Sequence, residues 1–178
     1  LRAARAIGKG SEAYAMQVKG LEVAAYNCKF IPGMALAFGV SPIGAHHKES
    51  WVITFEIKQT SRDSYGPEKA QKVIDLQRIR GGLFEYMVSC RFPWIELGWE
   101  LTNYPKYFNV VTGLSWTLDD FWTISDRIYA MIKLFWLREY PETDRYLDYP
   151  PAVWFDPDNA DTEGPIAGLH LEREKYDG

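Results

Sequence analysis

The stretch that decides the fold runs from Ala24 to Glu49 and reads AAYNCKFIPGMALAFGVSPIGAHHKE. It places a tyrosine, a cysteine and two adjacent histidines in a mostly apolar run that is broken by glycine and proline. Because polar and titratable groups are costly to bury, a cluster of them in apolar sequence is typical of a functional site. Pro32 favours the start of a helix, and Pro42 with Gly44 predicts a turn just before the histidines.

The segments on both sides of this stretch are short and mixed. Leu1 to Ile7 predicts a short helix that Gly8 stops, and Ala15 to Val18 allows a strand. His46 to Lys58 alternates imperfectly between apolar and polar residues, so it is compatible with either a helix or extended chain. A polar loop is expected from Gln59 to Gly66.

A longer helix is predicted from Pro67 to about Ser89, with Gly81 and Gly82 inside it. Glycine within a helix costs roughly 1 kcal/mol relative to alanine. The pair therefore indicates a kink or a close approach by another segment. Pro93 is expected to end or bend the element that follows.

The clearest helix is predicted from Leu118 to Tyr140, where Thr117 and Asp120 form a capping box. Apolar side chains recur along one face of this helix at helical spacing. We expect the core of the protein to be packed around five of them: Phe121, Ile124, Ile128, Met131 and Phe135. A shorter helix from Pro105 to Thr112, closed by Gly113, is predicted before it.

The C-terminal part predicts a long surface loop from Pro141 to Pro165, held to the core by Trp154 and Phe155. A last helix is expected from Leu169 to Asp177. Strands with clean alternation are scarce along the whole chain. Residues 1–178 therefore predict a single, mainly helical domain of the all-α class.

Composition excludes several classes of protein. The chain has 178 residues, 47% of them hydrophobic, which is ample for a packed core. The net charge of −4 gives no reason to expect a nucleic acid or an acidic membrane surface as a partner. Two cysteines do not make a disulfide framework, and no signal peptide or membrane-length apolar run is visible. We expect a cytoplasmic protein and, because the chain opens on leucine, a fragment of a longer one.

Two kinds of side chain in the central stretch could carry chemistry. His46 and His47 titrate near neutral pH, and the turn before them could aim either ring into a cavity; the ordinary alternative is a buried core histidine. Tyr26 is either a core aromatic residue or a hydrogen-bond donor to a substrate. The spacing of the histidines matches no zinc motif, so protein-bound zinc is not expected.

Structural or functional roles are also open for the cysteines and for one pair of charged residues. Cys28 is expected to be buried. Cys90 lies at a predicted helix end beside Arg91, where it is by default a small hydrophobic residue. A helix terminus and a cation would instead favour the thiolate that ligates a metal. Lys19 and Glu22 form either a structural ion pair or part of a cofactor pocket.

Two motifs carry a resemblance to a known family. Val18-Lys19-Gly20-Leu21-Glu22 and the run GMALAFGVSPIGAHH resemble the C-terminal region of the tungsten-containing aldehyde ferredoxin oxidoreductases. Tyr-Asn-Cys and the histidine pair resemble most closely the formaldehyde-type branch. Shorter matches in the same order extend the resemblance over nearly the whole chain: Asp126–Tyr129, Leu137–Glu139 and Asp148–Pro151.

The resemblance implies roles for particular residues. His47 would be the active-site histidine that hydrogen-bonds the substrate oxygen or the tungsten oxo group and passes on a proton, and Tyr26 would orient the aldehyde carbonyl. The segment EYMVSCRF resembles the family's D-x-x-G-L-C-x-F segment. Cys90 would then be the fourth ligand of a [4Fe-4S] cluster, with the backbone of Val88 and Ser89 near the pterin. Glutamate in place of aspartate, and Val-Ser in place of Gly-Leu, depart from the pattern at the pterin contact.

The implied function is oxidation of aldehydes to carboxylic acids, with a tungstopterin, a [4Fe-4S] cluster and ferredoxin as electron acceptor. The family's three-cysteine motif, catalytic glutamate and N-terminal pterin-binding β domain have no counterpart in this sequence. We therefore expect the chain alone to bind neither group and to be inactive. We also expect apolar surface near Phe38 and His47, normally covered by the enzyme's other domains, to drive oligomerisation. The alternative is a non-catalytic helical scaffold or interaction domain.

Overall fold

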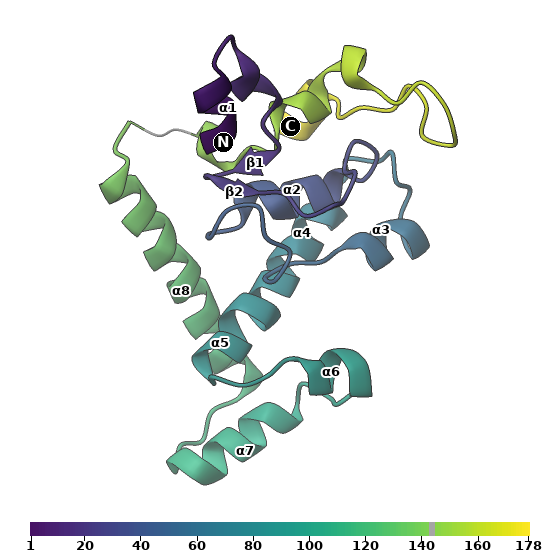
Figure 1. Ribbon diagram of the computed structural model, residues 1–178. Helices are drawn as coiled ribbons and strands as arrows, with labels where there is room; N and C mark the ends of the chain where they lie inside the picture. Colours follow the sequence, from purple (N-terminus) through teal and green to yellow (C-terminus); the bar gives the residue numbers. More distant parts are fainter. Residues whose placement is uncertain (143–144) are drawn as a thin grey trace. The chain divides into compact units, whose positions relative to one another are not determined.

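The computed structural model describes residues 1–142 and 145–178. The all-α fold class is confirmed, because the described residues form helices and a single two-stranded sheet (Figure 1). The α-helices are α1 Arg2–Ile7, α2 Pro32–Val40, α3 Ile53–Lys58, α4 Pro67–Leu76, α5 Phe84–Tyr86, α6 Phe92–Leu97, α7 Asn103–Thr112, α8 Leu118–Glu139 and α9 Arg173–Asp177. The strands are β1 Gln17–Val18 and β2 Leu21–Glu22.

Helical turns of other types connect these elements. A π-helix, η2 Gln77–Leu83, joins α4 to α5. The 3₁₀ turns are η1 Ser11–Tyr14, η3 Arg145–Asp148, η4 Ala152–Phe155 and η5 Pro157–Asn159. The chain divides into two compact units: the first is Leu1–Ile74 with Glu142–Gly178, and the second is Asp75–Pro141. A single domain over the whole chain stays a prediction.

Helix α2 forms the centre of the first unit. It begins at Pro32, as the sequence predicts, and nearly every side chain on it is buried. Phe38 is completely buried and packs against Tyr26 and Trp154. The expectation of exposed apolar surface at Phe38 is therefore wrong. Because the helix is apolar all round, it is stable only inside a core.

The N-terminus of α2 is capped by a buried carboxylate from α3. Glu56 accepts hydrogen bonds from the backbone N–H groups of Gly33 at 2.8 Å and Met34 at 2.7 Å. Its other neighbour is the buried ammonium of Lys69 on α4, 2.9 Å away. A helix N-terminus has unpaired N–H groups and a positive dipole end, so this charge is well placed. A Cβ on residue 33 would lie 3.0 Å from the Glu56 carboxyl carbon, and glycine makes room for it.

The C-terminus of α2 is capped by a buried cation from the hairpin. Lys19 donates to the carbonyl oxygen of Gly39 at 2.6 Å and forms an ion pair with Asp148 at 3.0 Å. Lys19 thus has a structural ion pair whose partner is Asp148, and a part for Lys19 or Glu22 in a cofactor pocket stays a prediction. A Cβ on residue 39 would lie 2.4 Å from the Asp148 carbonyl oxygen, so that position also needs glycine. Both ends of α2 thus depend on charged side chains from distant segments.

The hairpin and the C-terminal segment complete the first unit. β1 and β2 pair in antiparallel fashion through a tight turn, in which Lys19 and Gly20 both have positive φ. Trp154 is buried, as predicted, and its carbonyl oxygen accepts from the backbone N–H of Leu171 at 2.7 Å. The predicted start of the last helix, Leu169, is wrong. Leu171 is buried in extended chain, and α9 begins only at Arg173.

The second unit has an aromatic core. Phe121 of α8 is fully buried and packs with Leu83, Phe84 and Tyr104. The predicted capping box is confirmed, since Asp120 accepts from the backbone N–H of Thr117 at 2.7 Å.

Only the N-terminal part of the predicted apolar face of α8 reaches this core. Ile124 and Ile128 are half-buried, whereas Met131 is 68% exposed and Phe135 is 55% exposed. The prediction that Met131 and Phe135 lie in the core is therefore wrong. The buried residues that pack on Phe121 come from segments before α8 in the chain, and α8 extends well past them.

The glycine pair marks a close approach, as the sequence predicts. A Cβ on Gly82 would lie 2.0 Å from Oγ of Ser125, so η2 and α8 touch at this point. The hydroxyl of Ser125 is 3.0 Å from the carbonyl oxygen of Arg78, one of the carbonyls that a wider π turn frees. The helix from Pro67 thus changes type at residue 77 and ends at Tyr86, before the predicted Ser89. Pro93 lies in the first turn of α6, so it begins an element where the sequence predicts an end.

Candidate functional site

The two histidines lie on the loop that follows α2. The loop is fixed to the hairpin, because the backbone N–H of Ala45 donates to the carbonyl oxygen of Val18 at 3.3 Å. Gly44 has a φ of 98° and lies so close to Leu21 that a Cβ would be 2.7 Å from its Cβ. The predicted turn at Pro42 and Gly44 is therefore present, and only glycine fits its tightest position.

This loop brings His47 against Tyr26. The ring centroids are 5.5 Å apart and the rings meet edge to face at 76°. Tyr26 also contacts Phe38 of α2, with centroids 6.0 Å apart, so the tyrosine lies between the buried helix and the histidine. The structure thus brings together two predicted site residues that are 21 positions apart. Both rings are half-buried, which leaves their polar atoms able to reach a ligand.

His46 stacks on His47 and has polar neighbours of its own. The two imidazole centroids are 5.3 Å apart and the rings are nearly parallel, at 13°. Nδ1 of His46 accepts from the backbone N–H of Lys48 at 2.7 Å, which assigns its ring proton to Nε2. The buried carboxylate of Glu49 lies 4.0 Å from the same nitrogen and accepts from the Ser41 hydroxyl at 3.3 Å. Sequence reasoning missed Glu49 and Ser41, because nothing local predicts that both ends of the loop meet.

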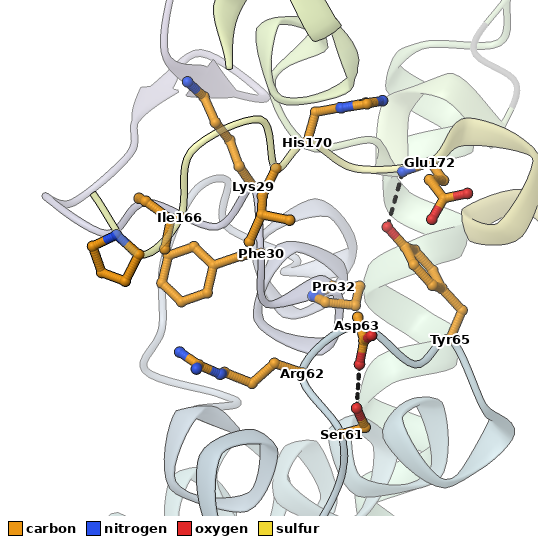
Figure 2. Close-up of a pocket in the computed structure, with 12 residues that line it drawn as sticks. Lys29, Phe30, Pro32, Ser61, Arg62, Asp63, Tyr65, Ile166, His170 and Glu172 are labelled. Carbon is orange, nitrogen blue, oxygen red and sulfur yellow. Dashed lines mark hydrogen bonds between the residues drawn. The ribbon is translucent and has the colours of Figure 1, made fainter. Parts of the chain in front are cut away.

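The cavities of the first unit include two of similar size. One of about 390 Å³ has Tyr26 in its wall, with Asn27, Lys29 and Trp154. Figure 2 shows the other, of about 380 Å³, whose wall includes Phe30, Arg62 and Tyr65. The Tyr65 hydroxyl there accepts from the backbone N–H of Glu172, and burial raises its pKa. Tyr26 is thus the predicted residue that borders a space large enough for a small organic molecule.

The predicted cofactor segment lies at the end of α5 in the second unit. The backbone N–H of Ser89 donates to the carbonyl oxygen of Phe84 at 3.0 Å, and that of Val88 to Glu85 at 3.1 Å. This pair of bonds is a Schellman motif, which places Val88 in the position that usually holds glycine. Val88 has a φ of 50° and is 93% exposed. A β-branched residue is strained in that conformation.

Cys90 directly follows this motif and is exposed, so it is not the buried small residue of the default interpretation. It lies between the C-terminus of α5 and Arg91, the N-cap residue of α6. Arg91 forms an ion pair with Glu85 at 3.0 Å, so its charge favours a thiolate less than the sequence indicated. The thiol does lie near Tyr104, whose pKa is raised by burial and then by the charge of Cys90.

Cys28 is buried, as predicted. Burial raises the pKa of its thiol, and the nearby charge of Glu56 raises it further. Such a thiol is inert towards metals and electrophiles. Over residues 1–142 and 145–178, no group of three or more His, Cys, Asp or Glu side chains is placed to hold a metal ion.

Comparison with known proteins identifies the family. Residues 1–177 match the protein-family model described as "Aldehyde ferredoxin oxidoreductase, domains 2 & 3". The chain belongs to the aldehyde ferredoxin oxidoreductase family. No curated protein matches the chain. The match spans both compact units and includes every predicted site residue.

Membership of the aldehyde ferredoxin oxidoreductase family makes this an oxidoreductase-type chain. The family generally binds a metal–pterin cofactor and an iron–sulfur group, and the matched description implies other domains of the same enzyme. Cys90 fits one ligand of such a cluster, since its thiol is exposed and a cluster takes cysteine thiolates. The described residues offer one exposed thiol. No helix in the described ranges has the length and apolar character needed to cross a membrane.

Proposed function

We propose that the chain provides the substrate-facing residues and one cluster ligand of an enzyme that oxidises aldehydes to carboxylic acids. The observation that carries the proposal is the contact between Tyr26 and His47, whose ring centroids are 5.5 Å apart, and Tyr26 also lines a cavity. A phenol and an imidazole at that separation can both reach the oxygen of one small carbonyl compound. The Tyr-Asn-Cys sequence favours formaldehyde or another short aldehyde.

The proposed reaction converts an aldehyde and water to a carboxylic acid, two protons and two electrons. The tungstopterin and the [4Fe-4S] cluster, when bound in the complete enzyme, supply the redox chemistry and pass the electrons to ferredoxin. The chain's own residues orient the substrate and move a proton. Tyr26 donates its hydroxyl to the aldehyde oxygen, and His47 accepts or returns the proton at an imidazole nitrogen.

The second unit has a separate role in this proposal. Cys90 holds the cluster as one of its four ligands, and the backbone of Val88 and Ser89 lies towards the pterin. Cytoplasmic location, and association of the chain with itself and with the enzyme's other domains, remain our predictions. The exposed apolar side chains on the C-terminal half of α8 support association.

The test is His47→Ala in the full-length enzyme. Turnover should fall by about 10²- to 10⁴-fold, the range for a positioned general acid or base, while metal and iron content stay near wild type. His170→Ala is the matched control, because His170 is the third histidine of the chain and lies outside the Tyr26 contact. Full turnover in the His47 variant would remove this residue from the mechanism.

Cys90→Ala distinguishes the proposed enzyme from a non-catalytic scaffold. In an enzyme of this type the variant should lose iron, visible absorbance and electron delivery to ferredoxin. Native full-length protein that contains neither tungsten or molybdenum nor iron would support the non-catalytic scaffold instead.

A further inference from the structure

Two buried glutamates in the first unit differ in how well their charges are compensated. Glu56 has two backbone N–H donors and an ammonium, all within 2.9 Å. Glu49 has a side chain only 6% exposed, yet its polar neighbours within the described ranges are the Ser41 hydroxyl at 3.3 Å and His46 at 4.0 Å. A carboxylate that is buried with so few partners costs stability. Glu56 is buried because it caps α2. Glu49 caps none of the described helices, so its burial needs a different explanation.

The position of Glu49 suggests that reason. Ser41 is the first residue after α2, so its bond to Glu49 closes the histidine loop at its base. The carboxylate lies at the edge of the His46 ring, at the nitrogen that the backbone N–H of Lys48 already occupies. The Lys48 N–H holds that edge of the ring, and the carboxylate adds no hydrogen bond to it, because the unprotonated nitrogen has no proton to donate. The face of the same ring carries the stacked His47, which in turn meets Tyr26.

We propose that Glu49 is a positioning residue that fixes His47 through His46. The bond between Glu49 and Ser41 holds the loop closed, which keeps the Lys48 N–H against Nδ1 of His46, and the His46 ring supports the stacked His47. A support of this kind orients a proton-carrying imidazole without touching the substrate. The proposal rests on the proposed function of His47.

The first test is spectroscopic and needs no cofactor. In the 178-residue chain with ¹⁵N-labelled histidine, three imidazoles are observed, because the chain has three histidines. The wild type should show His46 with an unprotonated Nδ1 and a protonated Nε2. Glu49→Gln weakens the charge-assisted bond to the Ser41 hydroxyl that closes the loop, so it should leave the chain folded by circular dichroism but shift the signals of both His46 and His47. Unchanged spectra for both rings would overturn the proposal.

The second test uses the full-length enzyme loaded with its cofactors. Glu49→Gln should lower kcat by roughly 10- to 100-fold, the usual effect of removing a group that orients another, and leave KM within about twofold. Ser41→Ala, which keeps the charge and removes one hydrogen bond, should give a smaller fall. Glu163→Gln is the matched control, since Glu163 is an exposed carboxylate of the same unit.

The two tests separate the failure of this inference from that of the proposed function. A wild-type enzyme that oxidises no aldehyde would remove the function, and the imidazole spectra of Glu49→Gln would still decide the positioning. A variant that unfolds more easily but keeps both kcat and the spectra would show that Glu49 is structural, which overturns the proposal.

Discussion

Helices α2 and α8 are stabilised in opposite ways. α8 has a local cap and an amphipathic pattern, yet the second half of its apolar face is exposed. α2 has neither a side-chain cap of its own nor an amphipathic pattern, yet nearly all of it is buried. Its ends are satisfied by Glu56 and by Lys19 from other segments. Local pattern therefore predicts that a helix exists, and burial depends on what the rest of the chain brings to it.

The largest expected effect comes from breaking the distant cap of α2. Glu56→Ala removes a fully buried carboxylate and leaves Lys69 buried without its partner. The free energy of unfolding should fall by about 3 to 5 kcal/mol, the range for one half of a buried ion pair. Urea unfolding followed by tryptophan fluorescence measures it. The exposed Glu22→Ala should change stability by less than about 0.5 kcal/mol. Equal losses of stability in the Glu56 and Glu22 variants would refute the role of Glu56 as a cap.

The next effect compares two phenylalanines on α8. Phe121→Ala opens a cavity in the aromatic core and should cost about 3 kcal/mol, the low end for such a change, since its ring neighbours can partly close the gap. Phe135→Ala should cost less than about 0.5 kcal/mol, because that side chain is exposed. Thermal unfolding of both variants by circular dichroism is the measurement. A large loss at Phe135 would mean that the exposed face of α8 is covered in solution.

The C-terminal end of α5 has a valine, Val88, in a backbone conformation that favours glycine. Val88→Gly should stabilise the chain by roughly 1 kcal/mol, because glycine relieves a left-handed backbone that costs valine about 1 to 2 kcal/mol, less the entropy of the unfolded glycine. Val110→Gly is the matched control: this valine is similarly exposed but lies inside α7, where glycine in place of valine should destabilise by roughly 0.3 to 0.5 kcal/mol. Urea unfolding measures both changes in the free energy of unfolding. If they have the same sign, the strain at Val88 is refuted.

The smallest effect concerns the local cap of α8 and its dependence on pH. Hydrogen bonds from the Thr117 backbone N–H and hydroxyl lower the pKa of Asp120. A lowered folded-state pKa means that the cap stabilises fully above the unfolded value of about 3.9 and is lost as the pH falls through the folded value. The melting temperature of wild type should exceed that of Asp120→Ala at neutral pH. This difference in melting temperature should narrow only below about pH 4. If it stays constant down to about pH 2, the charge of Asp120 is not what stabilises the cap.

Much of the local structure could be predicted because it depends on neighbours in sequence. The cap at Thr117, the helix start at Pro32, the turn at Gly44 and the burial of Cys28 were all confirmed. The glycine pair at residues 81 and 82 predicted a close approach, and Ser125 provides it. The cap, the helix start and the turn follow from backbone restriction or from groups within a few residues of one another, which the sequence shows directly.

What the tertiary structure decided involves residues that are far apart in the chain. Periodicity could not show that α8 runs past its core, because the pattern is the same whether or not another segment covers it. Nothing in the run around Glu56 or Lys19 predicts that they cap α2, and nothing around Glu49 predicts that it meets Ser41 and His46. The sequence supplied the residue types of the candidate site. The meeting of Tyr26 with His47 required the fold, because contact between distant residues depends on packing of the whole unit.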